Sequence, residues 1–313
     1  MWILPALLPR SSDGKASGAR DCDARQDRLR STALSVLVSP TAIMLPTYEI
    51  YCVKYAERPG QRPTHFVGGD PHDVPMPMDY FVWLVRDSGN AERTVLVDTG
   101  FDADMAINGR VLLRKPVEGL ALVGTQGADI KDVIITHLHN DHVGTFYDFP
   151  NARFHLQDKE MQYVTGRHMK HNIFRRPYQI DHVAGMIRLV YQNRVVFHNG
   201  DAGNASEVAP GISVHHIGGH TMGLQSVRVH TARGWVVLAS DASHYYEHFE
   251  QDRCYPLVYH LGEMLEGFAT LRRLADSPQH IIPGHDPLVF KRYPAVSPEL
   301  AGIAARLDLP PQH

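Results

Sequence analysis

From residue 48 onward, short apolar and β-branched runs alternate with polar turns, which is the pattern of a domain rich in strands. Aromatic and β-branched residues alternate over 48–55, and apolar runs cover 80–85 and 94–97. The sequence Asp87-Ser88-Gly89-Asn90 between the last two runs is a turn signal, so they predict a β-hairpin. Further strands are predicted at 131–136, 152–156, 194–197, 212–217, 226–230 and 235–239.

Three segments have the spacing of helices instead, and they lie at 158–164, 261–275 and 297–307. In the second segment, apolar residues recur at helical intervals, namely Leu261, Met264, Leu265, Phe268, Leu271 and Leu274. Strands and helices are therefore mixed along the chain. This mixture predicts an α/β fold in which two sheets pack together and the helices lie outside.

The first part of the chain, residues 1–46, differs from the remainder. The segment 11–30 is rich in Ser, Gly, Asp and Arg without apolar periodicity, which is typical of disorder. The apolar stretches 2–8 and 34–45 are short and interrupted by proline, so they match neither a signal peptide nor a membrane span. We predict an N-terminal extension at 1–46 and one folded domain over 47–313, and we expect translation to begin at Met44.

Composition points to a soluble globular protein. Of the 313 residues, 43% are hydrophobic and 21% are charged, and the formal net charge of -3 indicates neither a nucleic acid nor a membrane surface as partner. Cys22, Cys52 and Cys254 are scattered, so we expect free thiols in a reducing compartment, the cytoplasm. The expected partner is a small-molecule substrate, and the sequence leaves a homodimer open.

One short segment concentrates metal-ligand side chains directly after the strand predicted at 131–136, and it reads His137-Leu138-His139-Asn140-Asp141-His142. In an extended chain, residues two apart face the same side, so His137 and His139 point together. Asp141 and His142 follow where the chain turns, and they can reach a second centre. Four donors in six positions exceed the three protein ligands of one tetrahedral catalytic zinc ion and favour two metals. A polar loop with surface histidines is the alternative, but these ligand types rarely coincide at this spacing.

Three further candidate ligands, His220, Asp241 and His285, each follow a β-like run. Glycines beside His220 and His285 permit tight loops that bring the backbone near a metal. Ligands at the ends of several strands can converge on one edge of a sheet. Taken alone, each of the three is equally well explained as an ordinary loop residue. The dinuclear site indicated by the first segment, however, needs such additional donors.

Together these segments resemble the motifs of the metallo-β-lactamase superfamily. Its HxHxDH signature is matched at 137–142, and its later motifs are matched by Gly219-His220-Thr221-Met222-Gly223, Ser240-Asp241-Ala242 and Pro283-Gly284-His285-Asp286. The early Val97-Asp98-Thr99-Gly100 resembles the DTG turn of the family. The resemblance runs in order over roughly residues 48–290. It implies an αβ/βα sandwich of two mixed sheets, with two divalent metal ions at one edge.

The same resemblance implies a role for each ligand. His137, His139 and His220 would bind one metal ion. Asp141, His142 and His285 would bind the other. Asp241 would bridge the two, with a water or hydroxide between them. We expect zinc, because imidazole and carboxylate suit it and no redox ligand set is evident.

Within the superfamily, the quorum-quenching N-acyl homoserine lactonases are the most similar branch. The segment Val74-Pro75-Met76-Pro77-Met78-Asp79-Tyr80 resembles the corresponding segment of that branch. The branch commonly has a catalytic Tyr three residues after the bridging Asp, where this chain has His244, followed by Tyr245 and Tyr246. We expect Tyr245 or His244 to donate to the carbonyl oxygen as the oxyanion forms.

The predicted reaction is the opening of a lactone by a metal-held hydroxide, in which Asp141 serves as a ligand and Asp241 passes a proton to the leaving alkoxide. Thioester hydrolysis, as in glyoxalase II, and β-lactam hydrolysis on the same site are the alternatives. Flavodiiron proteins have Glu where His139 stands, and some β-lactamases use a Cys near Asp241, which this chain lacks. A metal-binding sensor without turnover would have no chemical need for all seven ligands.

Other residues near these motifs have two readings each. Asp98 either orients a ligand loop or is an ordinary turn residue. The segment 162–178 either covers the pocket or is a solvated connection, and its basic residues are His168, Lys170, His171, Arg175 and Arg176. The aromatic residues Phe146, Tyr147 and Phe149 either line the pocket or pack in the core.

Overall fold

The computed structural model describes residues 45–200 and 205–312. The extension predicted at 1–46 lies outside these residues, except for Leu45 and Pro46, and so does Cys22. In the described chain Cys52 and Cys254 are free thiols, as expected, and both are buried. No helix of the described chain combines the length and the apolar character that crossing a bilayer requires.

Eight strands of the described chain form the first sheet, in the order β13-β1-β2-β3-β5-β6-β7, with β4 paired to β1 beside this path. Their bounds are β1 Tyr48–Arg58, β2 Met78–Asp87, β3 Asn90–Val97, β4 Val111–Leu112, β5 Asp132–Ile134, β6 Arg153–Gln157, β7 Val195–His198 and β13 Ala304–Arg306. The hairpin predicted around residue 88 is confirmed, because β2 and β3 pair antiparallel with Asp87 opposite Asn90. From β3 to β7 the strands are parallel, so β3, β5 and β6 end at the same edge of the sheet.

The second sheet has five strands within the described residues, in the order β12-β11-β10-β9-β8. Their bounds are β8 Ala205–Ala209, β9 Ile212–His216, β10 Gln225–Thr231, β11 Gly234–Ser240 and β12 Ile281–Pro283. All pairs are antiparallel except β11 with β12, which are parallel. The parallel pair places the residues that follow β11 and β12 at one edge.

The core has two layers because the strands of the first sheet bury both faces. On one face of β2, Trp83 and Val85 belong to the cluster that also holds Val227 and Leu238 of the second sheet. On the other face, Leu84 packs in a second cluster with residues of the outer helices. Strand residues that alternate between two buried faces read as nearly continuous apolar runs, which is what 80–85 shows.

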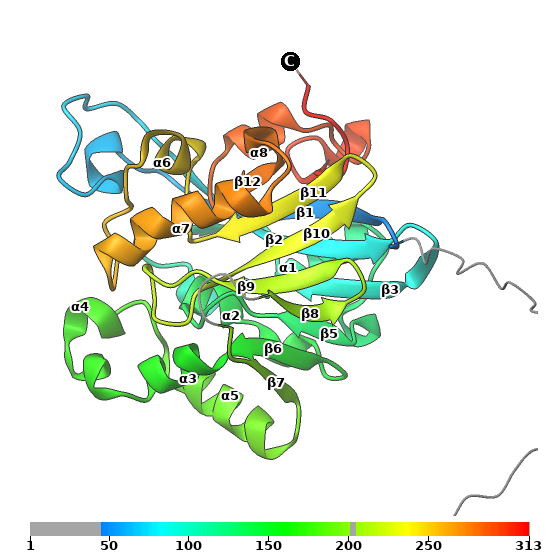
Figure 1. Ribbon diagram of the computed structural model, residues 1–313, viewed down its shortest axis with the longest axis horizontal. Coiled ribbons are helices and arrows are strands. Elements are labelled where there is room, and N and C mark those ends of the chain that lie inside the picture. The colour runs from blue at the N-terminus through cyan, green and yellow to red at the C-terminus, as the bar shows by residue number, and fades with distance from the viewer. Residues whose placement is uncertain (1–44, 201–204, 313) are drawn as a thin grey trace, which may run out of the picture. The chain divides into compact units, whose positions relative to one another are not determined.

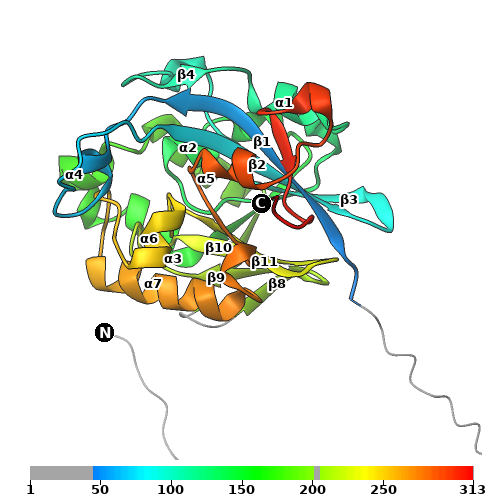
Figure 2. The ribbon, with the colours of Figure 1, turned by 90° about the horizontal axis from the view of Figure 1, so that it is seen from above.

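Helices cover the outer faces of both sheets (Figure 1), with bounds α1 Pro116–Leu122, α2 Asn140–Val143, α3 Asp158–Val164, α4 Asn172–Arg175, α5 Ile180–Tyr191, α6 Tyr246–Gln251, α7 Leu261–Leu274 and α8 Leu288–Arg292. Figure 2 shows α7 on the outer side of the second sheet and α1 on the outer side of the first. The predicted sandwich of two mixed sheets with external helices is therefore confirmed.

The helices predicted at 158–164 and 261–275 are confirmed as α3 and α7, whereas the helix predicted at 297–307 is wrong. That segment forms one 3-10 turn, Pro298–Leu300, and then β13, which pairs with β1. Gly302, at a φ of 72°, turns the chain between them. The sheet edge overrides the local helical preference there. Helix α5 was not predicted, although Val183, Met186 and Leu189 form its buried stripe.

Candidate metal centre

The loop after β5 carries the first candidate ligands. It leads from the strand to His139, the residue before the one-turn helix α2. His137 and His139 lie side by side, with ring centroids 4.3 Å apart, and both rings are buried. Leu138 between them packs in the apolar core. The extended loop thus turns both imidazoles to one side, as its sequence pattern indicates.

Two further candidates, Asp241 and His285, meet because β11 and β12 are neighbouring parallel strands. Asp241 directly follows β11, and His285 follows β12 after Gly284. A β-carbon on Gly284 would lie 2.8 Å from the backbone of Ser240, so only glycine allows this close approach.

His220 arrives from the loop after β9, through two glycines in the left-handed region. Gly218 and Gly219 have φ values of 73° and 79°. A β-carbon on Gly219 would lie 2.5 Å from the backbone nitrogen of Met264, at the start of α7. The loop therefore packs tightly on α7, and this packing fixes the position of His220.

Asp241 lies at the middle of the cluster, and its two carboxylate oxygens face different histidines. Oδ2 lies 3.1 Å from His220 Nε2 and 3.7 Å from His137 Nε2. Oδ1 lies 3.0 Å from His285 Nε2 and 3.3 Å from His142 Nε2. A carboxylate that divides its oxygens between two groups of imidazoles has the geometry of a bridging ligand.

Two groups of donors around Asp241 are compact enough to hold one metal ion each. The first consists of His137, His139, His220 and Asp241, and the second of Asp141, His142 and His285. In each group the candidate ligand atoms lie within 4.8 Å of one another. The seven residues that the sequence singles out thus come together in one place.

The hydrogen bonds around the cluster show that these residues fit a metal. His220 Nδ1 lies 2.6 Å from the Leu257 carbonyl and His285 Nδ1 lies 2.8 Å from the Asp79 carbonyl, so both rings donate outward. In the neutral rings, the Nε2 lone pairs then face the carboxylate of Asp241. Two acceptors about 3 Å apart repel each other unless a cation lies between them. A metal ion supplies that cation.

Two buried ring nitrogens without a hydrogen-bond partner also indicate that these residues fit a metal ion. The buried Nε2 atoms of His137 and His142 have no hydrogen-bond partner. A buried polar atom without a partner is costly, and a metal ion would satisfy both. Imidazole and carboxylate donors suit zinc.

Asp98 holds His142 from the side away from the cluster. Its Oδ2 lies 2.8 Å from His142 Nδ1, and its Oδ1 accepts the backbone N–H of Thr136 at 2.8 Å. Asp98 is fully buried and has a φ of 60°, which a residue without an essential contact would avoid. The structure thus favours the reading in which Asp98 orients a ligand loop over that of an ordinary turn residue.

Glu160 of α3 lies beneath two ligand loops and is completely buried. Its Oε1 accepts the backbone N–H of Leu138 at 3.0 Å and the hydroxyl of Tyr178 at 3.1 Å. Its Oε2 accepts the hydroxyl of Thr221 at 2.7 Å and the backbone N–H of Gly223 at 3.1 Å. One carboxylate therefore ties the loop of His137 and His139 to the loop of His220.

Arg110 holds the acidic ligand of the first segment. Its guanidinium donates to Asp141 Oδ2 at 3.1 Å and to Asn140 Oδ1 at 2.7 Å. The rings of Tyr80 and Phe101 each lie 5.1 Å from the guanidinium carbon. Arg110 thereby occupies one oxygen of Asp141 and leaves the other free for a metal.

The electrostatics keep several ligands unprotonated, which metal binding requires. Burial lowers the pKa of His137 and His139 well below its usual value. Burial opposes ionisation of Asp141, but Arg110 and other positive neighbours outweigh it and hold the pKa of that carboxyl below its usual range. Burial also opposes ionisation of Asp241, but the surrounding histidines, His244 first, outweigh it and hold the pKa of Asp241 well below its usual value.

The pKa of His142 shifts in the opposite direction. Burial opposes its protonation, but the carboxylates of Asp241, Asp98 and Asp141 outweigh burial and raise the pKa of His142 well above its usual value. Three carboxylates thus surround this imidazole and favour a positive charge at its position.

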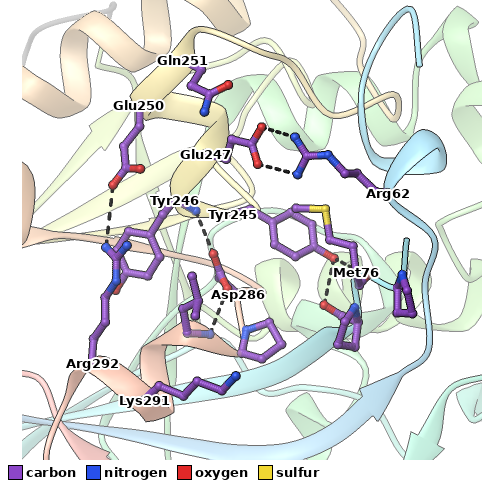
Figure 3. A pocket seen from close by; sticks show the side chains of 14 residues that line it. Arg62, Met76, Tyr245, Tyr246, Glu247, Glu250, Gln251, Asp286, Lys291 and Arg292 are labelled. Atoms are coloured by element: carbon purple, nitrogen blue, oxygen red, sulfur yellow. Dashed lines mark hydrogen bonds and ion pairs between the residues drawn. The ribbon is translucent and has the colours of Figure 1, made fainter. Parts of the chain in front are cut away.

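The two residues predicted as oxyanion donors lie in different surroundings. His244 is buried in the cluster, with Nε2 3.1 Å from Asp241 Oδ2. The structure does not bring the hydroxyl of Tyr245 into the cluster, because it donates to the carbonyls of Pro77 at 3.2 Å and Met76 at 3.4 Å. Figure 3 shows this hydroxyl directed at the segment that carries Met76. Tyr246 is buried in the apolar core.

Tyr245 also lines the cavity drawn in Figure 3, of about 390 Å³, together with Arg62, Glu247, Asp286 and Lys291 among others. None of the seven candidate ligands is among the residues that line this cavity. Its charged side chains are largely paired, for example Arg62 with Glu247 and Arg292 with Glu250. The cavity is therefore separate from the candidate metal centre.

Mostly apolar side chains surround His139 and His220 on one side. A small hollow of about 10 Å³ adjoins His139 and His220, and its other lining residues are Tyr163, Ile173, Phe174, Pro177, Leu257 and Val258. The basic side chains of 162–178 are exposed or half-buried. These side chains are thus solvated, as in the reading of 162–178 as a solvated connection, while Phe174 and Pro177 of the same segment lie beside His139 and His220. Among the other aromatic residues, Phe149 is fully buried in the core and Tyr147 is 53% exposed.

Three residues of the centre have no signal in the sequence, namely Arg110, Glu160 and Tyr255. Tyr255 stacks on His244, with ring centroids 3.7 Å apart and planes 15° apart. Each of the three comes from a different loop or helix. Their importance depends on contacts that only the fold creates.

Comparison with known proteins identifies the family. The sequence profile described as "Metallo-beta-lactamase superfamily" matches residues 76–293, which is more than half of the chain. This region contains all seven candidate ligands. The chain therefore belongs to the metallo-β-lactamase superfamily.

Among curated relatives, an N-acyl homoserine lactonase of Bacillus sp. is 30% identical over 178 residues, which cover 51% of this chain and 64% of that protein. A probable metallo-hydrolase of Mycobacterium tuberculosis is 24% identical over 223 residues, which cover 63% of this chain and 72% of that protein. The chain thus spans somewhat less than two thirds of the length of the Bacillus lactonase.

Solved structures share the fold. An N-acyl homoserine lactone hydrolase with N-hexanoyl-L-homoserine at its catalytic metal centre aligns with a TM-score of 0.62 and 21% identity, covering 78% of this chain and 94% of that one. A dizinc quorum-quenching lactonase aligns with a TM-score of 0.58 and 18% identity, covering 78% and 89%. At these identities the likeness establishes the fold alone.

Proposed function

We propose that this protein is a dinuclear metal-dependent hydrolase that opens lactones, with N-acyl homoserine lactones as the first substrates to test. The observation that carries the proposal is the placement of Asp241, whose two oxygens face two separate groups of histidines. Such a bridging carboxylate is useful for chemistry that needs two adjacent metal ions. The lactonases among the relatives support the substrate class.

In this proposal His137, His139 and His220 hold one ion, while Asp141, His142 and His285 hold the other. Asp241 lies between them. Zinc fits the donors, since all are imidazoles or carboxylates. The outward hydrogen bonds of His220 and His285 fix their rings so that Nε2 faces the centre.

The bound ions would lower the pKa of water towards neutrality and polarise a carbonyl group. The side chains of this chain supply the remaining requirements. Asp241 can take a proton at one oxygen and pass it to the alkoxide that leaves when the ring opens. The apolar side chains around His139 and His220, Phe174 and Val258 among them, favour an apolar substituent beside the reacting carbonyl.

A substrate panel on one metal-loaded sample tests this function. We expect hydrolysis of an N-acyl homoserine lactone, about two metal equivalents per chain, and loss of activity on chelation. Asp241→Asn should abolish turnover, whereas Asp132→Asn should not, because Asp132 pairs with Arg153 at the opposite end of β5. Full activity with one equivalent would contradict the dinuclear site. Turnover of only a thioester or only a β-lactam would replace the substrate assignment while retaining the site.

A further inference from the structure

One histidine in the cluster has no place among the seven ligands. His244 Nε2 lies 3.1 Å from Asp241 Oδ2, the same distance as His220 Nε2. Donor atoms bound to one zinc ion, each about 2.1 Å from it, lie roughly 3–4 Å apart. His244 therefore approaches Asp241 at the separation expected of two ligands of a common ion.

The donors of Asp241, His244 and His285 form a third compact group, all within 4.8 Å of one another. His244 is buried, and its Nδ1 has no hydrogen-bond partner. Nothing in the described surroundings uses its nitrogens except the carboxylate of Asp241. The side chain is thus free to give its Nε2 lone pair to a cation.

The ring of His244 is held in this direction by aromatic stacking. Tyr255 stacks on one face at 3.7 Å, and His65 in turn stacks on Tyr255 at 5.7 Å. The guanidinium of Arg58 lies beside Tyr255. This column leaves the ring little freedom to rotate, so its Nε2 faces the cluster before any metal binds.

We propose that His244 is an additional metal ligand. Its nearest oxygen of Asp241, Oδ2, also faces His220, but its donor atom lies in one compact group with those of Asp241 and His285, and this grouping assigns it to the ion of His285. This inference rests on the dinuclear site proposed above. It makes the two positions unequal. The ion at Asp141, His142 and His285 gains a fifth protein donor, whereas the ion at His137, His139 and His220 keeps four, including Asp241. The ion with fewer protein donors is the one beside the apolar side chains that surround His139 and His220.

Replacement of His244 by Phe keeps the ring and its stacking on Tyr255 but removes both nitrogens. The matched control is His248→Phe, because His248 is equally buried, lies 6.0 Å from His244 between ring centroids, and belongs to none of the metal-binding groups. Melting temperatures of the metal-free proteins establish that each variant is folded. If the His244→Phe variant is not folded, His244→Gln is measured in its place.

Two measurements besides activity decide the matter. Competition with a chromophoric chelator should show one zinc ion held roughly tenfold or more weakly in His244→Phe and the other unchanged, since even outer-sphere partners are worth 10–100-fold. X-ray absorption of the zinc-loaded protein should show an average of three imidazoles per ion in the wild type and fewer in the variant. The control should match the wild type in both.

Unchanged affinities and an unchanged imidazole count in His244→Phe would overturn the inference, and would leave His244 as a hydrogen-bonding group beside an intact dinuclear site. If the wild-type protein itself fails to hold two ions, the proposed function falls instead. The two failures are therefore distinguishable by the metal content of the wild type.

Discussion

The carboxylate of Glu160 accepts a hydrogen bond from the backbone N–H of Leu138, the residue between His137 and His139, at 3.0 Å. Its second oxygen accepts the hydroxyl of Thr221, next to His220. The three imidazoles of the first group thus depend on one buried side chain that touches none of them through its oxygens. Holding ligand loops from outside the coordination sphere is what makes a site rigid.

Glu160→Gln should weaken this arrangement. All four groups that meet the carboxylate are donors, and a glutamine would turn one of its own donors towards them. We expect the free energy of unfolding of the metal-free protein to fall by about 1–3 kcal/mol, the usual cost of an unsatisfied buried group. Urea titration measures this change. Glu263→Gln is the control, since Glu263 is exposed although it accepts the N–H of Gly219; equal losses in both variants would contradict the prediction.

Asp98→Asn should reduce metal affinity without removing a ligand. An asparagine that turns its NH₂ towards His142 Nδ1 no longer accepts from it, so the ring loses its fixed orientation. We expect roughly 10–100-fold weaker binding of the ion at His142, measured by chelator competition. Asp87→Asn, in the hairpin turn, should leave metal binding unchanged. Identical results for the two variants would reduce Asp98 to an ordinary turn residue.

Arg110→Met should affect the metal-free protein more than the loaded one. Without metal, the variant leaves Asp141 beside Asp241 with no guanidinium, and we expect a loss of about 1–3 kcal/mol in unfolding free energy. A bound cation would compensate for the missing charge, so the loss should shrink on loading with zinc. Arg194→Met, which also removes an Arg beside an aromatic ring, should show no such dependence on metal. Thermal unfolding with and without zinc tests the difference.

A histidine outside the centre should make stability depend on pH. Burial, assisted by Arg228 and Arg273, lowers the pKa of His215 to about 4. Between pH 4 and 6.5 the unfolded chain therefore binds a proton there that the folded chain does not, and stability must fall as pH falls through this window. His215→Gln should reduce the slope of unfolding free energy against pH by about 1.4 kcal/mol per pH unit there, and should leave the slope above pH 7 unchanged. If the wild type and His215→Gln had the same slope between pH 4 and 6.5 as well as above pH 7, His215 would not be buried in its neutral form.

The sequence predicts the strands, the two sheets and the seven candidate ligands because each has a recognisable local sequence pattern. Strand β11 is a short apolar run, and His137 and His139 have the spacing of an extended chain. The error at 297–307 has the opposite origin. Ala304 and Ala305 have no strong strand preference, and they form β13 because the edge of β1 is available for pairing.

The residues that position the ligands have no local sequence pattern, because their roles also depend on long-range contacts. Glu160 is one acidic residue in a predicted helix, and only the packing of α3 against two loops shows that it is buried. Arg110 reaches Asp141 across a fold that the sequence does not specify locally. Local patterns therefore reveal which residues carry the chemistry, while the residues that position them emerge from long-range contacts.

Tyr245→Phe separates a structural role from a catalytic one. In the structure its hydroxyl donates to the carbonyls of Pro77 and Met76, and it lines a cavity apart from the candidate ligands. Removing it should cost about 0.5–1.5 kcal/mol of stability, the usual worth of a hydrogen bond. Metal content and kcat should stay close to those of the wild type. A fall in kcat of roughly 10²–10³ with full metal content is the cost of losing an oxyanion donor. That result would require Tyr245 to turn towards the substrate during turnover, and it would show that the contact with Pro77 belongs to the resting enzyme alone.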